Sequence, residues 1–97
     1  MTAISTRQGR IGGISQGEVI SFLGVRYGVP PVGARRFMAS EMADGWHGVY
    51  DATNFPNRAM QNRTLSTLGL PVGGSVSEDC LFLNIATPSV AGSLRPV

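Results

Sequence analysis

The stretch "GISQG", residues 13–17, matches G-x-S-x-G, a motif that carries the nucleophile of many serine hydrolases. Glu41 and His47 follow Ser15 in the order Ser, acid, His that a catalytic triad would need. That motif works where the serine stands on a strained turn from a strand into a helix, whereas Gln16 and Gly17 lead into another β-favouring run. We therefore interpret Ser15 as a turn residue and His47 as a surface or capping residue, and we expect no catalytic residue in this chain.

Two further patterns could bind a metal or a phosphate. Asp44, His47 and Asp51 could be imagined as metal ligands, but three mixed ligands on turn-rich chain, without further histidine or cysteine, are a poor match to known sites. The glycines of "VGGSVSE" lack the lysine and the strand-loop-helix setting of a phosphate-binding loop. The sequence thus predicts no metal site and no cofactor.

Charge and composition narrow the classes of partner. The net charge is +2, and no stripe or cluster of arginines suggests nucleic acid or an anionic membrane as a partner. The N-terminus lacks the apolar core of a secretory signal, and no apolar run approaches the ~18 residues that cross a bilayer. With only one cysteine, Cys80, no internal disulfide can form, so we expect a reducing compartment and a cytoplasmic location.

The elements that would position these side chains are mainly short β segments. "GRIGGIS" (9–15) and "VISFLGVRYG" (19–28) are β-favouring runs separated by "QGE", which predicts an antiparallel hairpin. Pro30 and Pro31 then rule out regular strand or helix and predict an extended corner. A short strand is expected near Val49 and Tyr50, and one helical turn within residues 58–69.

The strongest element is the run "CLFLNIATP", residues 80–88. It is apolar on both faces, which is typical of a strand in the interior of a sheet. Such a strand needs a layer on each face, yet no amphipathic helix of three turns is visible. We therefore expect the chain to be incomplete as an independent fold.

Four segments carry a family resemblance. "GRIGGI", "FLGVRYGVPPVGARRF", "GWHGVYDAT" and "SEDCLFLNIATP" occur in the order and spacing seen at the start of type-B carboxylesterases, a group that includes para-nitrobenzyl esterases and cholinesterases. The resemblance covers roughly residues 9–97 and implies the α/β class, as the N-terminal β-rich portion of an α/β-hydrolase fold that forms the antiparallel start of a large mixed sheet. It implies that residues 1–97 are a partial domain, truncated before the oxyanion loop and the catalytic triad.

The resemblance also implies structural roles for five residues. Many members close a disulfide between the cysteine matching Cys80 and an earlier cysteine before a glutamine, but here Met60 stands before Gln61. Cys80 is then interpreted as a small buried hydrophobe, with a reactive or intermolecular thiol as the alternative. The remaining roles are an Arg36–Glu78 ion pair, buried or solvated, and hydrogen bonds to nearby backbone from Asp79 and Asn84.

Two departures and a set of aromatic residues complete the expectations. Arg26 stands where the family commonly has proline and Gly28 where it has alanine, which would loosen the corner. We favour core packing over a substrate cleft for the aromatic residues Phe22, Tyr27, Phe37, Trp46 and Phe82. The expected function is the scaffold of a serine carboxylesterase whose substrate is a small-molecule ester, with a non-catalytic interaction module or one half of a split esterase, joined by a complementing chain, as alternatives.

Overall fold

The protein is seen here as a computed structural model that describes residues 1–61 and 75–97. The described elements are β1 (Thr2–Ser5), β2 (Arg10–Gln16), β3 (Val19–Arg26), a short 3-10 helix η1 (Gly33–Arg35), β4 (Val49–Asp51) and β5 (Phe82–Thr87). The helical turn predicted within residues 58–69 falls largely outside the described residues. The elements are therefore almost all strands, as the sequence predicts.

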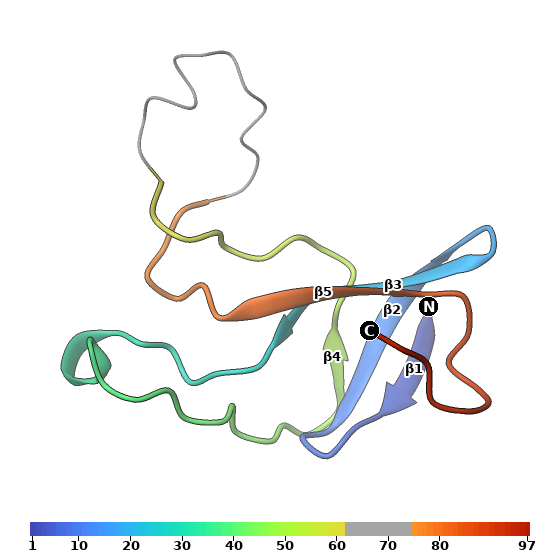
Figure 1. Cartoon of the computed structure of the whole chain (residues 1–97), viewed down its shortest axis with the longest axis horizontal. Helices are drawn as coiled ribbons and strands as arrows, with labels where there is room; N and C mark the ends of the chain where they lie inside the picture. The colour runs from blue at the N-terminus through green and yellow to red at the C-terminus, as the bar shows by residue number, and fades with distance from the viewer. Residues whose placement is uncertain (62–74) are drawn as a thin grey trace, which may run out of the picture.

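The strands form one sheet of order β1-β2-β3-β5, with β4 beside β2 (Figure 1). The first half of β2 pairs with β1 in antiparallel fashion and with β4 in parallel fashion, while its second half pairs with β3. β2 thus changes partners near its middle, and this change links the two parts of the sheet.

The predicted hairpin is confirmed as β2 and β3. Gln16 pairs with Val19 across the two-residue turn at Gly17 and Glu18, and Gly17 has a φ of 62°. Positive φ at this position matches the turns whose twist suits a hairpin, which is why glycine fits there. The short strand predicted near Val49 and Tyr50 is also present, as β4. β1 was not predicted, because "TAIS" is too short and too mixed to show a periodicity.

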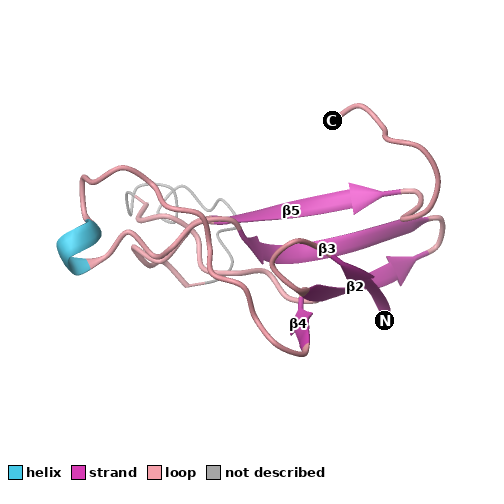
Figure 2. Ribbon diagram, turned by 90° about the horizontal axis from the view of Figure 1, so that it is seen from below, coloured by secondary structure: helices cyan, strands magenta, loops and turns pink. Residues whose placement is uncertain are grey.

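β5 is the predicted strand, and within the described residues it lies at an edge of the sheet. It pairs with β3 in antiparallel fashion and is the last strand in the described sheet order (Figure 2). Leu83 and Ile85 are 40% and 42% exposed, so apolar side chains of β5 face solvent in the described part of the chain.

The hydrophobic core lies where β2, β3 and the segment after β4 meet. Ile11, Phe22 and Ala52 are buried there, and Trp46 and Tyr50 pack against them. Gly13 makes room for Phe22, because a Cβ at this glycine would lie 2.7 Å from the Phe22 ring. The glycines of "GRIGG" therefore serve packing as well as strand formation.

The proline corner is extended, as predicted, apart from the short turn of η1 (Figure 1). Phe37 follows it with a φ of 59° and is 99% exposed, while Tyr27 is 49% exposed. The expectation of core packing is therefore wrong for these two aromatic residues. It holds for the Phe22 ring, and Trp46 and Phe82 are half-buried.

Candidate functional site

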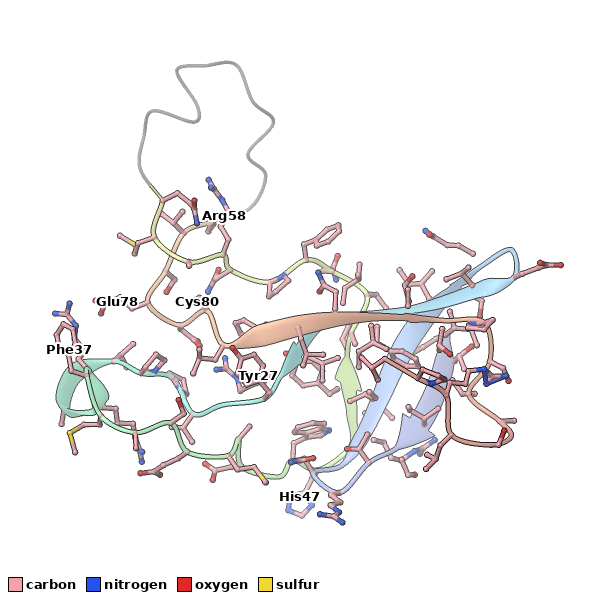
Figure 3. All side chains as sticks on the ribbon, in the orientation of Figure 1. Tyr27, Phe37, His47, Arg58, Glu78 and Cys80 are labelled. Atoms are coloured by element: carbon pink, nitrogen blue, oxygen red, sulfur yellow. The ribbon has the colours of Figure 1, made fainter. Side chains whose placement is uncertain are left out.

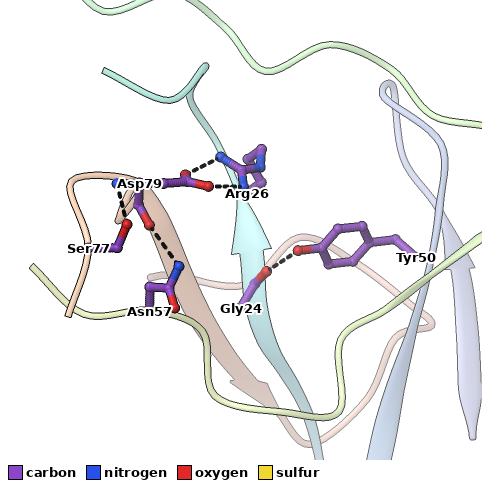
Figure 4. A network of polar contacts seen from close by, with 6 residues as sticks. All are labelled: Gly24, Arg26, Tyr50, Asn57, Ser77 and Asp79. Atoms are coloured by element: carbon purple, nitrogen blue, oxygen red, sulfur yellow. Dashed lines mark hydrogen bonds and ion pairs between the residues drawn. The ribbon is translucent and has the colours of Figure 1, made fainter. Parts of the chain in front are cut away.

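The best-organised polar site lies around a bulge between β3 and β5. The register shifts between Phe22 and Val25, so Leu23 and Gly24 together oppose Asn84. Gly24 has a φ of 71°, and its backbone groups leave the ladder. Its N–H donates to Asn84 Oδ1 at 2.9 Å, and its carbonyl accepts from the Tyr50 hydroxyl at 2.8 Å (Figure 4 shows the Tyr50 contact). Two side chains thus satisfy the hydrogen-bonding groups that the bulge releases.

Asp79 is bound by Arg26 at the end of β3, not by nearby backbone as the sequence suggested. Both carboxylate oxygens accept from the guanidinium, at 2.6 and 2.9 Å (Figure 4). The Arg26 guanidinium also lies over the Phe82 ring, 4.4 Å from its centroid. We call Arg26, Asp79 and Phe82 the Arg26 cluster. Arg26 therefore does not loosen the corner; it joins β3 to the start of β5.

The electrostatics of this pair follow from its geometry. The hydrogen bonds from Arg26 lower the pKa of the Asp79 carboxyl, and partial burial opposes this shift without cancelling it. The same hydrogen bonds raise the pKa of Arg26 above its already high ordinary value. The pair is consequently charged at neutral pH, with the bidentate geometry that favours strong arginine–carboxylate contacts.

The structure places Arg36 Nε 3.1 Å from Glu78 Oε1. The two side chains are 54% and 44% exposed, so water reaches both charges. An ion pair this exposed stabilises a fold by no more than about 1 kcal/mol. The sequence left open whether the Arg36–Glu78 pair is buried or solvated. In the structure the two charges are in contact and solvated.

Cys80 is a free, half-buried cysteine beside an open cavity of about 530 Å³. The remaining residues that line this cavity are Phe55, Pro56, Asn57, Arg58, Phe82, Leu83 and Asn84. Figure 3 shows Cys80 and Arg58 on neighbouring segments at this end of the molecule. Burial of the thiol is therefore partial, and Met60, the residue that stands before Gln61, is 66% exposed.

The three residues of the formal triad pattern are bound elsewhere or exposed. The Ser15 hydroxyl lies 2.9 Å from Thr2 Oγ1, near the hairpin turn. Glu41 Oε2 lies 2.7 Å from Arg35 Nη1, at the proline corner. The hairpin turn and the corner are at opposite ends of the molecule (Figure 1), and His47 is exposed. The structure does not bring these residues together.

The described residues contain neither a candidate cluster of metal ligands nor a candidate membrane-spanning helix. Within residues 1–61 and 75–97, there is no group of three or more His, Cys, Asp or Glu side chains that could hold a metal ion. In the same residues, no helix has the length and apolar character needed to cross a bilayer.

Sequence reasoning missed three members of the polar site. Tyr50 was expected only as part of a strand, and Gly24 only as part of a β run. Arg26 was noticed only because proline is common at its position in the family. That departure did not reveal its ion pair, because the partner, Asp79, is 53 residues away in sequence. Gly28 was noticed for the same kind of reason, and a Cβ there would lie 2.8 Å from Leu81 Cδ1.

Known proteins resemble this chain along its whole length. The family model described as "Carboxylesterase family" matches residues 1–97. Human Neuroligin-2 is 37% identical over 94% of the chain, and para-nitrobenzyl esterase of Bacillus subtilis (strain 168) is 33% identical over 97% of it. The chain spans 13% and 19% of the length of these two relatives.

A crystal structure shows the same fold. A carboxylesterase of Geobacillus stearothermophilus superposes with a TM-score of 0.82 at 38% identity, over 99% of this chain and 18% of its own. The strands described above are thus the N-terminal, β-rich portion of an α/β-hydrolase fold. On this evidence the chain belongs to the carboxylesterase family.

Proposed function

We propose that the chain is the N-terminal part of a serine carboxylesterase that hydrolyses small-molecule carboxylic esters through an acyl-serine intermediate. The observation that carries the proposal is the family match over residues 1–97, together with the sheet shared with a carboxylesterase at 38% identity. In such an enzyme a serine attacks the ester carbonyl, a histidine transfers the proton, and backbone amides stabilise the oxyanion.

In this proposal the described residues supply scaffold and no catalytic group. Ser15 contacts Thr2, and Glu41 contacts Arg35, so neither is oriented toward a histidine. A nucleophilic serine needs a base within hydrogen-bond reach, usually held by a third group. The residues that perform the reaction would then lie on polypeptide outside residues 1–97, in the same chain or in a complementing one.

The first experiment treats the native polypeptide from its source with a fluorescent organophosphonate, which reacts with activated serines. Its intact mass is measured and the labelled peptide is mapped by mass spectrometry. We expect a mass several-fold above 10.2 kDa and a label outside residues 1–97. A label on Ser15 would overturn the scaffold role.

A second experiment assays the 97-residue chain alone with p-nitrophenyl butyrate. We expect no saturable hydrolysis. The matched control is Ser15→Ala, which removes the only serine in a G-x-S-x-G pattern within residues 13–17. Saturable turnover that disappears in this variant would contradict the proposal.

One observation favours a second candidate, a binding module that associates with another polypeptide. The apolar side chains Leu83 and Ile85 are exposed on the strand that ends the described sheet. Co-purification from the source distinguishes the candidates. A native 10.2 kDa chain that elutes with a second polypeptide and has esterase activity only in that complex would indicate a split esterase. The same complex without activity would indicate a binding module.

A further inference from the structure

The segment before β5, residues 77–81, is attached to the rest of the molecule along its length, beginning with the Ser77 N–H, which donates to the Arg58 carbonyl at 3.0 Å. Asp79 holds Arg26 through two hydrogen bonds, and the Tyr27 N–H donates to the Leu81 carbonyl at 3.2 Å. Asn57 Nδ2 adds a longer contact of 3.4 Å to the Asp79 carbonyl. We call residues 77–81 the lead-in segment. Among these contacts the Arg26 pair is the ion pair, and a second ion pair, between Arg36 and Glu78, also joins the lead-in segment to the chain before it.

The neighbouring ion pair cannot hold the lead-in segment in the same way. The Arg26 and Asp79 side chains are 25% and 31% exposed, whereas those of Arg36 and Glu78 are 54% and 44% exposed. Arg26 binds through two nitrogens and lies 4.4 Å from the centroid of Phe82, while Arg36 binds Glu78 through Nε at 3.1 Å and lies 5.5 Å from the centroid of the exposed Phe37 ring. Because screening by water weakens the exposed pair more, the Arg26 pair should dominate the attachment.

Cys80 directly follows Asp79, so its thiol moves with the lead-in segment. Cys80 is half-buried and lines the same open cavity as Phe55, Pro56 and Phe82. Cys80 stands between Asp79 and Leu81, which both contact the chain of β3 and Tyr27, so detachment of residues 77–81 would expose the part of Cys80 that is buried. The rate at which a bulky reagent reaches the thiol therefore depends on how often the segment opens.

We propose that the Arg26 cluster is a local conformational latch: it sets the population in which residues 77–81 detach from β3, and thereby controls access to the Cys80 thiol. Loss of either charge releases the segment and leaves the other charge without its partner. The inference concerns only described residues and does not rest on the proposed esterase function.

The test compares two adjacent acids that each pair with an arginine. The reaction of Cys80 with dithiobisnitrobenzoate is measured at neutral pH, relative to a peptide of sequence "SEDCLFLN" treated in the same way. We expect Asp79→Asn to accelerate labelling about tenfold. Loss of a hydrogen bond between charged groups changes an opening equilibrium by about this factor. Glu78→Gln is the matched control, with an expected change of less than about twofold. Equal acceleration in both variants would overturn the proposal.

Amide hydrogen exchange keeps the test independent of the reagent and detects unfolding of a variant. The Tyr27 amide, directly after β3, donates to Leu81 in the lead-in segment, whereas the Leu23 amide, within β3, donates to Ala52 at 2.7 Å. In Asp79→Asn we expect exchange at Tyr27 to rise about tenfold while Leu23 remains protected. Arg26→Lys, which keeps the charge and loses the planar fork, should lie between the wild type and Asp79→Asn. Equal loss of protection at Tyr27 and Leu23 would show global unfolding and would overturn a local latch.

Discussion

At the scale of single residues, two adjacent acids show how strongly solvent exposure affects the contribution of an ion pair to stability. Glu78 and Asp79 each contact an arginine, but only Asp79 is bound at both oxygens, and its arginine lies 4.4 Å from the centroid of the half-buried Phe82 ring, whereas Arg36 lies 5.5 Å from the centroid of the exposed Phe37 ring. Charged hydrogen bonds with restricted water contribute about 1–3 kcal/mol, whereas exposed pairs contribute about 0–1 kcal/mol. Arg26 and Asp79 should therefore matter more for stability than Arg36 and Glu78.

The pH dependence of stability should report the Asp79 carboxyl. Its folded-state pKa lies below the ordinary value, so the pair stabilises the folded state above about pH 4 and this contribution is lost as pH falls through the folded-state pKa. We expect the thermal midpoint of the wild type to exceed that of Arg26→Gln by a constant amount near neutral pH. The difference should narrow on acidification, as measured by circular dichroism. A difference that stays constant into strong acid would contradict this assignment.

Residue roles were predictable from the sequence only where a known pattern carried them. The family resemblance singled out Glu78, Asp79 and Asn84, and the structure has Asn84 accept a backbone N–H. The choice of partner for Asp79 could not be read from the sequence, because Arg26 is remote along the chain and the contact exists only once β3 and β5 pair. Exposure of Phe37 was equally unpredictable, since an aromatic side chain in a β-rich sequence is usually buried.

At the scale of elements, the bulge in β3 is built from three segments. β3 supplies Gly24, β4 supplies Tyr50, and β5 supplies Asn84, so the bulge fixes how these strands sit together. A left-handed residue at this point demands glycine, and its neighbours leave little space. A Cβ on Gly24 would lie 3.2 Å from both the Asn54 carbonyl oxygen and Pro56 Cβ.

The two left-handed glycines of the β2–β3 unit give a matched pair of substitutions. Gly17 has a φ of 62° with nothing within 4 Å of an added Cβ, so Gly17→Ala should cost about 1–2 kcal/mol from backbone strain alone. Gly24→Ala carries the same strain and crowds its neighbours, which should add about 1 kcal/mol or more. Urea unfolding of both variants measures the difference. Equal free energies of unfolding for Gly17→Ala and Gly24→Ala would show that the residues around Gly24 accommodate the added Cβ without loss of stability.

Strands with a clear local sequence pattern could be predicted, and strand pairings that depend on distant residues could not. The β2–β3 hairpin carries a turn glycine between two β-favouring runs, and β5 carries a long apolar run, so both were found. The apolar run of β5 does not by itself tell which strand lies beside it, because an apolar strand looks the same whether or not a second neighbour is present. The pairing of β4 with β2 is parallel and non-local, and no short pattern indicates it.

At the scale of the whole molecule, the described residues have a small core and a large apolar surface. The hydrophobic side chains buried among them belong to Ile11, Phe22, Ala43 and Ala52. From Leu81 to Leu94 the sequence contains no charged residue, so β5 lacks the charged side chains that usually protect an exposed strand edge. The 97-residue chain should therefore associate with itself when it is isolated.

Gel filtration with light scattering tests this association. We expect Ile85→Lys to shift the isolated chain toward the monomer, because a charge on the edge strand opposes further pairing. Val19→Lys is the matched control, since Val19 on β3 has the same 42% exposure as Ile85. An equal shift in both variants would point to net charge as the cause. A wild-type chain that is already monomeric would contradict the prediction outright.

The fully exposed Phe37 lies at the junction between two halves of one sheet. The chain before it supplies β1, β2 and β3, and the chain after it supplies β4 and β5. The pairings of β2 with β4 and of β3 with β5, together with the Arg26–Asp79 pair, all join one half to the other. A peptide bond cut by chymotrypsin after Phe37 would thus leave two fragments that remain associated without a covalent link, each carrying strands that complete the other.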